Sequence, residues 1–496
     1  MRPPRVFERC LPWVIVLAVL PPAFAQDRQA TVEQQLKEHR EKLESLEKQL
    51  EGLKSGQLAK SAEAKKEVEN NKVKLTLEYD QGFVMKSADK RFSFQVNGRL
   101  QMDAQARLTG RDRNHGSTSI NGFKERRVFL GAKGTIYKYW NFVVTGTYES
   151  GTVLSGDDNY IETTYIEQAK LRFGQFKVPF SLESNTSDLF VKLIERSMAV
   201  DAFTPSRNQG LMVHGEVLDK RIAYWAMLGN GNRTERSDND DDKYGWARLV
   251  IRPFQTSENK WIKGLHIGAS GGVGKQDKLA PSLDSPGVVQ TATGTRIIEY
   301  ASGVTLDGES LRGGLEFGWL AGPFMLTGEY LILRQELRNG TDGDPRGPFS
   351  RREDSRFRGG HVTAAYLLTG ENQSYGRIYP KNNYEPGHPD SGPGAWELAA
   401  RYDFVETEKG DTAFFIGGLN VGGTAFVLKP ERVQQVMAGV NWYPNPAVKV
   451  SLNWQSAWWT HQVGEGFISG RAPPAVGSPK QPKNQNTLMM RVQIDF

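Results

Sequence analysis

The segment TLMMRVQIDF (487–496) ends the chain with ten residues that alternate between two kinds of side chain. In an extended strand, successive side chains point to opposite faces. One face carries Leu488, Met490, Val492, Ile494 and Phe496. The other face carries Thr487, Met489, Arg491, Gln493 and Asp495. This period of two predicts a β-strand with one apolar face, and its length suits a tilted strand that crosses a bilayer.

The same alternation recurs upstream, from about Arg91 onward. In 448–455, apolar residues alternate with Lys449, Ser451, Asn453 and Gln455. A soluble β-sandwich would show similar strands, with its polar face in water. Aromatic residues near the strand ends favour a membrane, because such rings suit the interface between lipid and water. The examples are Trp396, Trp442, Trp454 and Phe496.

Sixteen segments have this pattern. They are 92–106, 123–136, 140–149, 160–168, 169–176, 209–218, 221–229, 244–253, 264–274, 310–320, 324–337, 357–369, 395–406, 433–443, 447–459 and 485–496. Short connections mostly alternate with long ones, as in outer-membrane barrels. The connection 370–394 is an exception, since it is long where a short turn is due. We therefore predict an all-β fold, a 16-stranded antiparallel transmembrane β-barrel over residues 73–496.

The N-terminus predicts export. Arg2, Arg5 and Arg9 precede an apolar run from Leu11 to Leu20, and Ala23-Phe24-Ala25 is a small-residue cleavage pattern. Residues 1–25 therefore read as a signal peptide. A transmembrane anchor is the alternative, but the run is about half the ~20 residues that a spanning helix needs. The single cysteine, Cys10, lies within this segment, so the mature chain would have no disulfide or thiolate.

Residues 26–72 have a different pattern. Val32, Leu36, His39, Leu43, Leu46, Leu50 and Leu53 follow steps of four and three. This spacing predicts a coiled-coil helix, located in the periplasm and followed by a polar linker beyond Gly56. A lone amphipathic helix is marginal in water, so self-association is the favoured interpretation. A solvated single helix or a disordered segment is the alternative.

Composition and motifs exclude several classes of function. The net charge is +6 over 496 residues, a small excess that does not predict a nucleic-acid partner. The seven histidines are scattered, and none lies in a GxSxG or HExxH motif. We therefore predict no enzymatic activity, no catalytic residues, no metal site and no cofactor.

Several blocks, in order, resemble the phosphate-selective porin O/P family. They are RFSFQVNGRLQMD (91–103), FKERRVFLGAKGTIYKYWNF (123–142), LRFGQFKVPFSLE (171–183), LIERSMAVD (193–201), AAYLLTGE (364–371), GAWELAARYD (394–403) and GVNWYPNPAVKVSLNW (439–454). The resemblance implies a trimeric outer-membrane barrel, with one pore per subunit narrowed by its third loop, here 177–208. Phosphate-type anions are the solutes that it implies.

The resemblance also implies pore residues. Arg126 and Arg127 match an arginine pair on the second strand, Arg99 matches a first-strand arginine, and Glu162 matches an acid on the fourth. Two departures argue against a tight phosphate site. Ser184 stands where phosphate-specific members have lysine, and loop 275–309 holds only Lys275, Lys278 and Arg296.

A diffusion pore needs a polar lumen, a constriction and a field of suitable sign. Our candidates for contact with anions are Arg99, Arg126, Arg127, Glu162, Lys177, Lys192, Arg196 and Arg207. The alternative is that these arginines pair with acids and brace the wall. The expected partners are outer-membrane lipid, further copies of the chain in a homotrimer, small anions such as phosphate, and peptidoglycan through the coil. A weakly selective general porin, or a tether from the outer membrane to the cell wall, is the alternative function.

Overall fold

The fold was analysed in a computed structural model. It describes residues 23–70, 75–79, 82–109, 121–148, 155–231, 241–279, 287–294, 296–298, 304–339, 351–407, 419–421, 424–426, 432–459 and 484–496. The chain divides into two compact units, Met1–Lys74 and Leu75–Phe496. The division falls next to the boundary that we predicted between the coil and the barrel.

The described residues of the first unit form one helix, α1 (Ala23–Asn70). The leucines of the predicted seam are all at least half exposed, from 50% at Leu36 to 71% at Leu53. The helix continues through Gly52 and Gly56, so the predicted linker is helical as far as Asn70. Alanine, lysine and glutamate dominate that stretch, and all three favour helix. Most of the predicted signal peptide, 1–22, lies outside the described residues. None of the described helices is both long and apolar enough to span a membrane.

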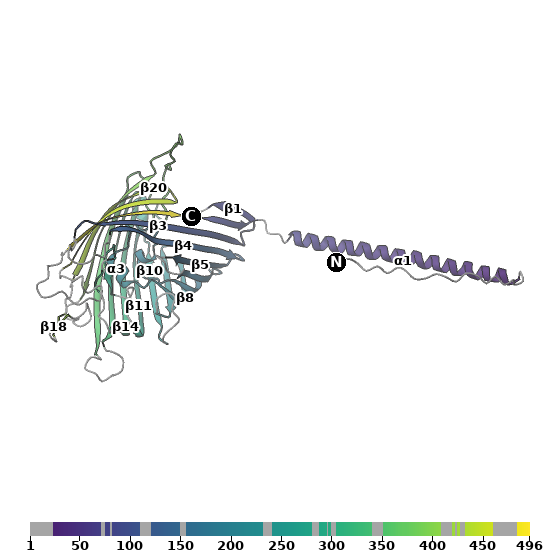
Figure 1. Ribbon diagram of the computed structural model, residues 1–496, viewed down its shortest axis with the longest axis horizontal. Helices are drawn as coiled ribbons and strands as arrows, with labels where there is room; N and C mark the ends of the chain where they lie inside the picture. Colours follow the sequence, from purple (N-terminus) through teal and green to yellow (C-terminus); the bar gives the residue numbers. More distant parts are fainter. Residues whose placement is uncertain are drawn as a thin grey trace. The chain divides into compact units, whose positions relative to one another are not determined.

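The second unit is a closed antiparallel β-barrel (Figure 1). Its wall consists of sixteen strands among the described residues: β3 (Ser93–Arg107), β4 (Gly122–Ile136), β5 (Trp140–Tyr148), β6 (Ser155–Thr163), β7 (Lys170–Lys177), β8 (Arg207–Val217), β9 (Ile222–Gly229), β10 (Tyr244–Ile251), β11 (Gly264–Leu279), β14 (Val304–Ala321), β15 (Phe324–Asn339), β16 (Arg351–Leu367), β17 (Ala395–Thr407), β20 (Arg432–Asn445), β21 (Val448–Trp459) and β22 (Asn484–Asp495). Each strand pairs with the next, and β22 pairs with β3 to close the ring. Backbone hydrogen bonds between Gly98 and Phe496 place the C-terminus beside β3.

The predicted strands correspond one to one with these sixteen, but β14 begins at Val304 and not at 310, β16 begins at Arg351 and not at 357, and β6 is shifted as a whole. We predicted 160–168, whereas β6 ends at Thr163. Tyr165 and Ile166 suit the apolar pattern, but they lie in the turn after β6 and are 61% and 60% exposed. The described strands that were not predicted include β1 (Leu75–Tyr79) and β2 (Phe83–Ser87). They form a hairpin that pairs with the start of β3.

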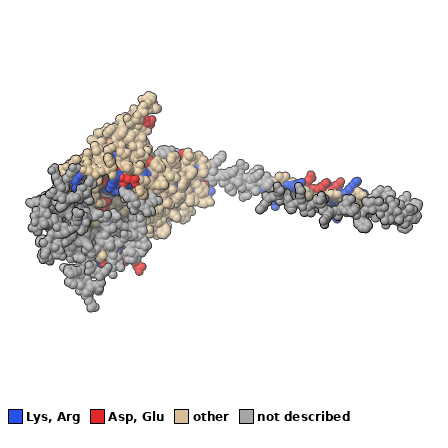
Figure 2. All heavy atoms as spheres, viewed as in Figure 1, with Lys and Arg blue, Asp and Glu red and all other residues tan. Residues whose placement is uncertain are grey.

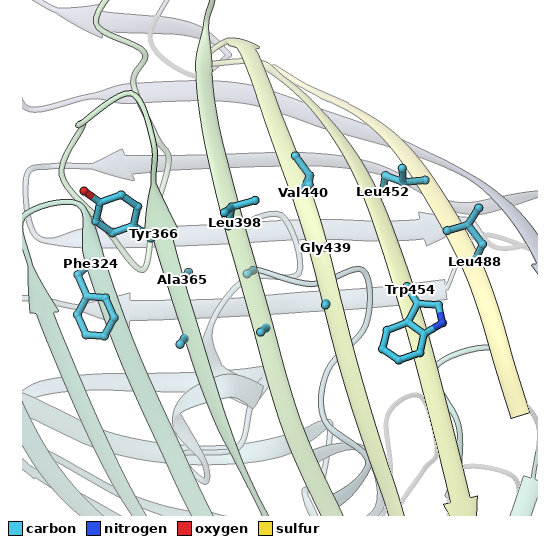
Figure 3. A pocket seen from close by; sticks show the side chains of 13 residues that line it. Phe324, Ala365, Tyr366, Leu398, Gly439, Val440, Leu452, Trp454 and Leu488 are labelled. Atoms are coloured by element: carbon cyan, nitrogen blue, oxygen red, sulfur yellow. The ribbon is translucent and has the colours of Figure 1, made fainter. Parts of the chain in front are cut away.

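The two faces of the wall separate as the alternation predicted. On β21, Leu452 and Trp454 are 49% and 41% exposed on the outer face, while Asn453 and Gln455 are fully buried on the inner face. A large apolar outer surface is stable where lipid replaces water as the solvent. A shallow groove in this surface lies over three alanines, Ala364, Ala400 and Ala438, which are paired across neighbouring strands (Figure 3).

Three segments fold inside the ring. The third loop (178–206) contains α2 (Leu182–Asn185) and α3 (Met198–Phe203). A short hairpin of β12 (Val289–Gln290) and β13 (Arg296–Ile298) packs near α3, and the Gly287 amide donates to the Ala202 carbonyl. The connection 368–394 is the exception noted in the sequence. It is anchored by Gln373, which donates to Glu397 at 2.8 Å, and by an ion pair between Arg377 and Asp495. Elsewhere, α4 (Lys260–Lys263) precedes β11, and β18 (Leu419–Val421) pairs with β19 (Thr424–Phe426).

Candidate functional site: the lumen and its constriction

The third loop is held in the lumen by an apolar underside. Phe180, Ala199 and Phe203 are fully buried. The ring of Phe180 contacts Trp246 on β10, and the ring of Phe203 contacts Phe357 on β16. Burial of a phenylalanine side chain contributes roughly 1.5–3 kcal/mol, so the two rings are substantial anchors. The loop is therefore part of the folded barrel, as we predicted for 177–208.

Acidic residues of the third loop face arginines of the wall. Asp188 lies 2.5 Å from Arg99 and 3.5 Å from Arg127. Glu195 lies 2.9 Å from Arg126 and 2.7 Å from Arg491. Figure 2 shows acidic and basic side chains gathered side by side on the visible face of the barrel. The loop and the wall are therefore joined by ion pairs at the narrowed part of the lumen.

These loop carboxylates stay ionised. Burial alone would raise the pKa of Asp188, but Arg99 and Arg127 outweigh it and hold that pKa well below its usual range. Burial would likewise raise the pKa of Glu195, yet Arg126 and Arg491 hold it far below the ordinary value. The constriction therefore carries fixed negative charges that cancel much of the arginine charge.

A β-bulge lets two consecutive arginines point into the lumen. Gln101 on β3 pairs with Arg127, but Met102 pairs with Glu125, so Arg126 is an extra residue in β4. Alternation alone would place Arg126 on the outer face. The bulge instead directs Arg126 to Glu195 at 2.9 Å, while Arg127 donates to Gln101 at 3.2 Å.

Two further candidates are paired within the wall. Glu162 on β6 lies 2.7 Å from Arg172 and 2.8 Å from His214. Arg207 lies 2.5 Å from Asp157 and 2.7 Å from Asp158. The structure therefore does not bring Glu162 into contact with the third loop, and Arg207 contacts wall acids.

The remaining three candidates differ from one another. Lys192 is buried and lies 3.2 Å from the fully buried Glu397. Lys177 donates to the backbone carbonyls of Ser184 at 2.8 Å and Thr186 at 3.2 Å. Arg196 donates to the carbonyls of Glu183 and Thr186. Two cations thus converge on the Thr186 carbonyl, and no carboxylate of the described residues lies within salt-bridge distance of either.

Sequence reasoning missed the carboxylates that organise this site. Asp188, Asp157 and Asp158 were not among the candidates, and Arg196 binds the backbone of Glu183 instead of a carboxylate. No periodicity marks acids in an irregular loop, so no pattern could have found Asp188. Lys124 and Lys133 are exposed on the inner face of β4, and neither makes a salt bridge among the described residues, although Lys124 is attracted by its cross-strand neighbour Asp103 and by Glu195. The described part of the chain contains no cluster of three or more potential metal ligands.

A closed barrel with a polar interior, a lipid-facing exterior and a loop folded into its lumen defines a porin, a channel of the bacterial outer membrane. The sequence model of the family "Phosphate-selective porin O and P" matches residues 94–457. The chain therefore belongs to that family, as the sequence blocks indicated.

Porin O of Pseudomonas aeruginosa is 27% identical over 404 residues, which cover 76% of this chain and 85% of that protein. Two solved structures are similar to the chain. The anion-selective porin from Comamonas acidovorans has a TM-score of 0.46 and 10% identity, and covers 82% of this chain and all of its own. The outer-membrane channel DcaP of Acinetobacter baumannii has a TM-score of 0.46 and 11% identity, and covers 83% of this chain and 99% of its own.

Proposed function

We propose that this porin admits small anions by passive diffusion, with phosphate-type anions among its solutes. One observation carries the proposal: four basic residues of β4 face the lumen, namely Lys124, Arg126, Arg127 and Lys133. They are spread over nearly the length of one strand, so an anion would meet positive charge along much of its path. The name of the family and the relative Porin O support phosphate as a solute.

The pairing of charges favours a pore with modest anion selectivity and argues against a tight phosphate-binding site. Guanidinium groups bind phosphate well when both donors of the fork are free to reach its oxygens. Here Asp188 and Glu195 occupy Arg99, Arg126 and Arg127. The unpaired lysines would then set the sign of the field, while the paired arginines hold the loop. A weakly selective general porin is the second candidate, and the same ion pairs favour it.

Passage of this kind is diffusion and requires no chemical conversion and no cofactor. The test is the reversal potential of single channels in planar bilayers under an about tenfold KCl gradient, with inorganic phosphate added as a competing ion. We expect a preference for chloride over potassium and a partial block by phosphate. A reversal potential at zero would support the weakly selective candidate. A preference for potassium would contradict a positive electrostatic field in the lumen, and with it the proposal.

We further propose that α1 forms a periplasmic coiled coil that stabilises a homotrimer. The exposed leucine seam supports this, because self-association would bury it. In a parallel, in-register coil, Lys42 of one helix would face Glu47 of the next, which is an attractive pair. Deletion of 31–56 should lower the temperature at which trimers dissociate in gels. An unchanged temperature would contradict this role.

A tether to peptidoglycan through the same helix is the alternative function for α1. It would coexist with the barrel embedded in outer-membrane lipid. Sedimentation of the intact protein with purified peptidoglycan tests it, with the 31–56 deletion as the control. Equal sedimentation of the two proteins would contradict the tether.

A further inference from the structure

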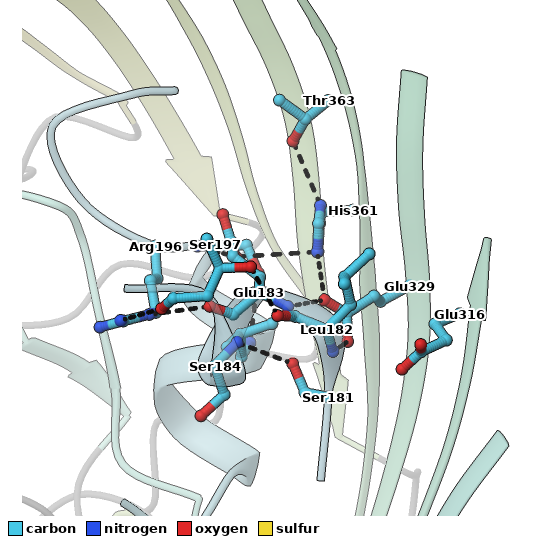
Figure 4. Close-up of polar contacts among 12 residues, drawn as sticks. Ser181, Leu182, Glu183, Ser184, Arg196, Ser197, Glu316, Glu329, His361 and Thr363 are labelled. Carbon is cyan, nitrogen blue, oxygen red and sulfur yellow. Dashed lines mark hydrogen bonds and ion pairs between the residues drawn. The ribbon is translucent and has the colours of Figure 1, made fainter. Parts of the chain in front are cut away.

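One buried histidine of the wall faces the third loop. His361 on β16 is 4% exposed and pairs in register with Glu329 on β15 and Asp403 on β17. Its Nε2 atom lies 3.3 Å from Glu329 Oε1 and 3.7 Å from Glu183 Oε2. Figure 4 marks the contacts of His361 with dashed lines. The Nδ1 atom of His361 lies 3.3 Å from the Thr363 hydroxyl. A single ring nitrogen therefore faces two carboxylates, one from the wall and one from the loop.

Both carboxylates hold the third loop in place. Glu329 accepts hydrogen bonds from the backbone amides of Leu182 at 3.0 Å and Glu183 at 2.7 Å. The Glu183 carboxylate accepts from the backbone amide of Ser197 at 2.9 Å and from Arg401 at 3.1 Å. The starts of α2 and α3 are thus fixed to the wall through the two acids that His361 contacts.

The charge of this cluster depends on His361. The acids Glu183, Glu329 and Asp403 face the histidine, and Arg401 lies among them. Arg196 contributes a second positive charge, since its side chain binds the Glu183 carbonyl. When all three acids are ionised, the cluster has one excess negative charge with a neutral imidazole and is balanced with an imidazolium.

The charge balance also depends on the nearby acid Glu316 and on the ionisation of Glu183. Glu316 on β14 lies 2.7 Å from Arg248, whose positive charge offsets its negative charge. Burial would raise the pKa of Glu183, but His361 and Arg401 outweigh it and lower that pKa, so this acid stays ionised. The imidazole is therefore the group whose proton decides whether the cluster is neutral.

We propose that His361 is a positioning residue that makes the constriction sensitive to pH. With a proton, its Nε2–H bridges Glu329 and Glu183 and locks the third loop against the wall. Loss of the proton removes the positive charge between these two buried carboxylates, and their repulsion loosens the loop. The inference rests on the proposed diffusion function, because a loosened loop is observed as a change in current through the pore.

The experiment records single channels of the intact protein in symmetric KCl between about pH 5 and 8, the range over which histidine changes charge. Brief closures in the wild type should become at least about threefold more frequent as the pH rises across this range. His361→Gln should show frequent closures at every pH, because glutamine has no positive charge that could hold the two carboxylates together. His214→Gln is the matched control, because His214 contacts Glu162 at 2.8 Å within the wall. It should keep the wild-type dependence.

Glu329→Gln is a second variant that decides the matter if His361→Gln does not assemble. It removes one of the two carboxylates that favour the proton, so the increase in closures should begin at lower pH. A pH dependence that survives in His361→Gln, or an unshifted dependence in Glu329→Gln, would overturn the inference. Absence of any conductance at any pH would instead count against the diffusion function, so the two failures are distinguishable.

Discussion

The Asp188 carboxylate of the third loop lies 2.5 Å from the Arg99 guanidinium of β3. This pair joins an irregular loop to a strand of the wall inside the lumen. It neutralises an arginine that the family resemblance places in the path of anions. The selectivity of this pore therefore depends on which cations lack such a partner.

Removal of the Asp188 charge should increase anion preference. In Asp188→Asn, Arg99 and Arg127 lose an anionic partner and can attract permeant ions. A single unscreened charge near a narrow pore changes ion preference by roughly two- to fivefold at an effective interaction of about 0.4–1 kcal/mol. Reversal potentials in a KCl gradient measure the effect. Asp219→Asn, in an exposed turn after β8, is the control and should leave the reversal potential unchanged.

Acid should produce the same change in the unmodified protein. Because the pKa values of Asp188 and Glu195 are depressed in the folded state, these acids stabilise the fold above their ordinary pKa. That stability is lost only as the pH falls through the depressed values. Protonation of these two acids should therefore raise anion preference only well below about pH 4, the ordinary range of a carboxyl group. A rise centred between pH 5 and 6 would contradict this assignment.

Neutralisation of the unpaired lysines should have the opposite effect. Lys124→Gln/Lys133→Gln removes two exposed lumen charges without breaking a salt bridge, because neither lysine makes one among the described residues. We expect the anion-to-cation permeability ratio to fall by about twofold or more. Lys138→Gln, in the exposed turn between β4 and β5, tests for non-specific effects. Equal ratios in the double variant and this control would refute the role of the β4 lysines.

Loss of Arg401 should destabilise the barrel. Its side chain is 1% exposed and lies 2.9 Å from Asp403 and 3.1 Å from Glu183. Arg401→Gln leaves those acids buried without their partner, which costs about 3–5 kcal/mol. The temperature that converts the folded band to the unfolded band in gels should fall. Arg358→Gln breaks an ion pair with Glu406 at a side chain that is 57% exposed, and should cost less than about 1 kcal/mol.

The connection 368–394 should restrict the pore. Arg377 binds Asp495 on β22 and the Pro446 carbonyl, which hold this segment against the last strands. Arg377→Gln should release it and increase single-channel conductance, because less of the lumen is filled. Lys381→Gln is the control, since the Lys381 side chain donates to the Thr369 carbonyl at 2.9 Å, which lies within the same segment. A conductance equal to that of the wild type in Arg377→Gln would show that the segment does not narrow the path.

The sequence by itself determined the barrel, its number of strands and the face of each strand. The reason is local: side chains alternate with a period of two, so a run such as 487–496 specifies both the strand and its lipid-facing side. The family resemblance also identified basic residues of the lumen. The turn residues Tyr165 and Ile166 show the limit of this reasoning, because an apolar side chain in a turn is indistinguishable from one in a strand.

Only the tertiary structure decided which cations are paired. Asp188 is 89 residues from Arg99, and Glu183 is 218 residues from Arg401. Such contacts depend on how an irregular loop packs inside the ring, and no local pattern encodes that packing. The bulge at Arg126 is a similar case, since one extra residue reverses the direction that alternation predicts. The wall follows from short-range periodicity, whereas the charge of the lumen follows from long-range packing.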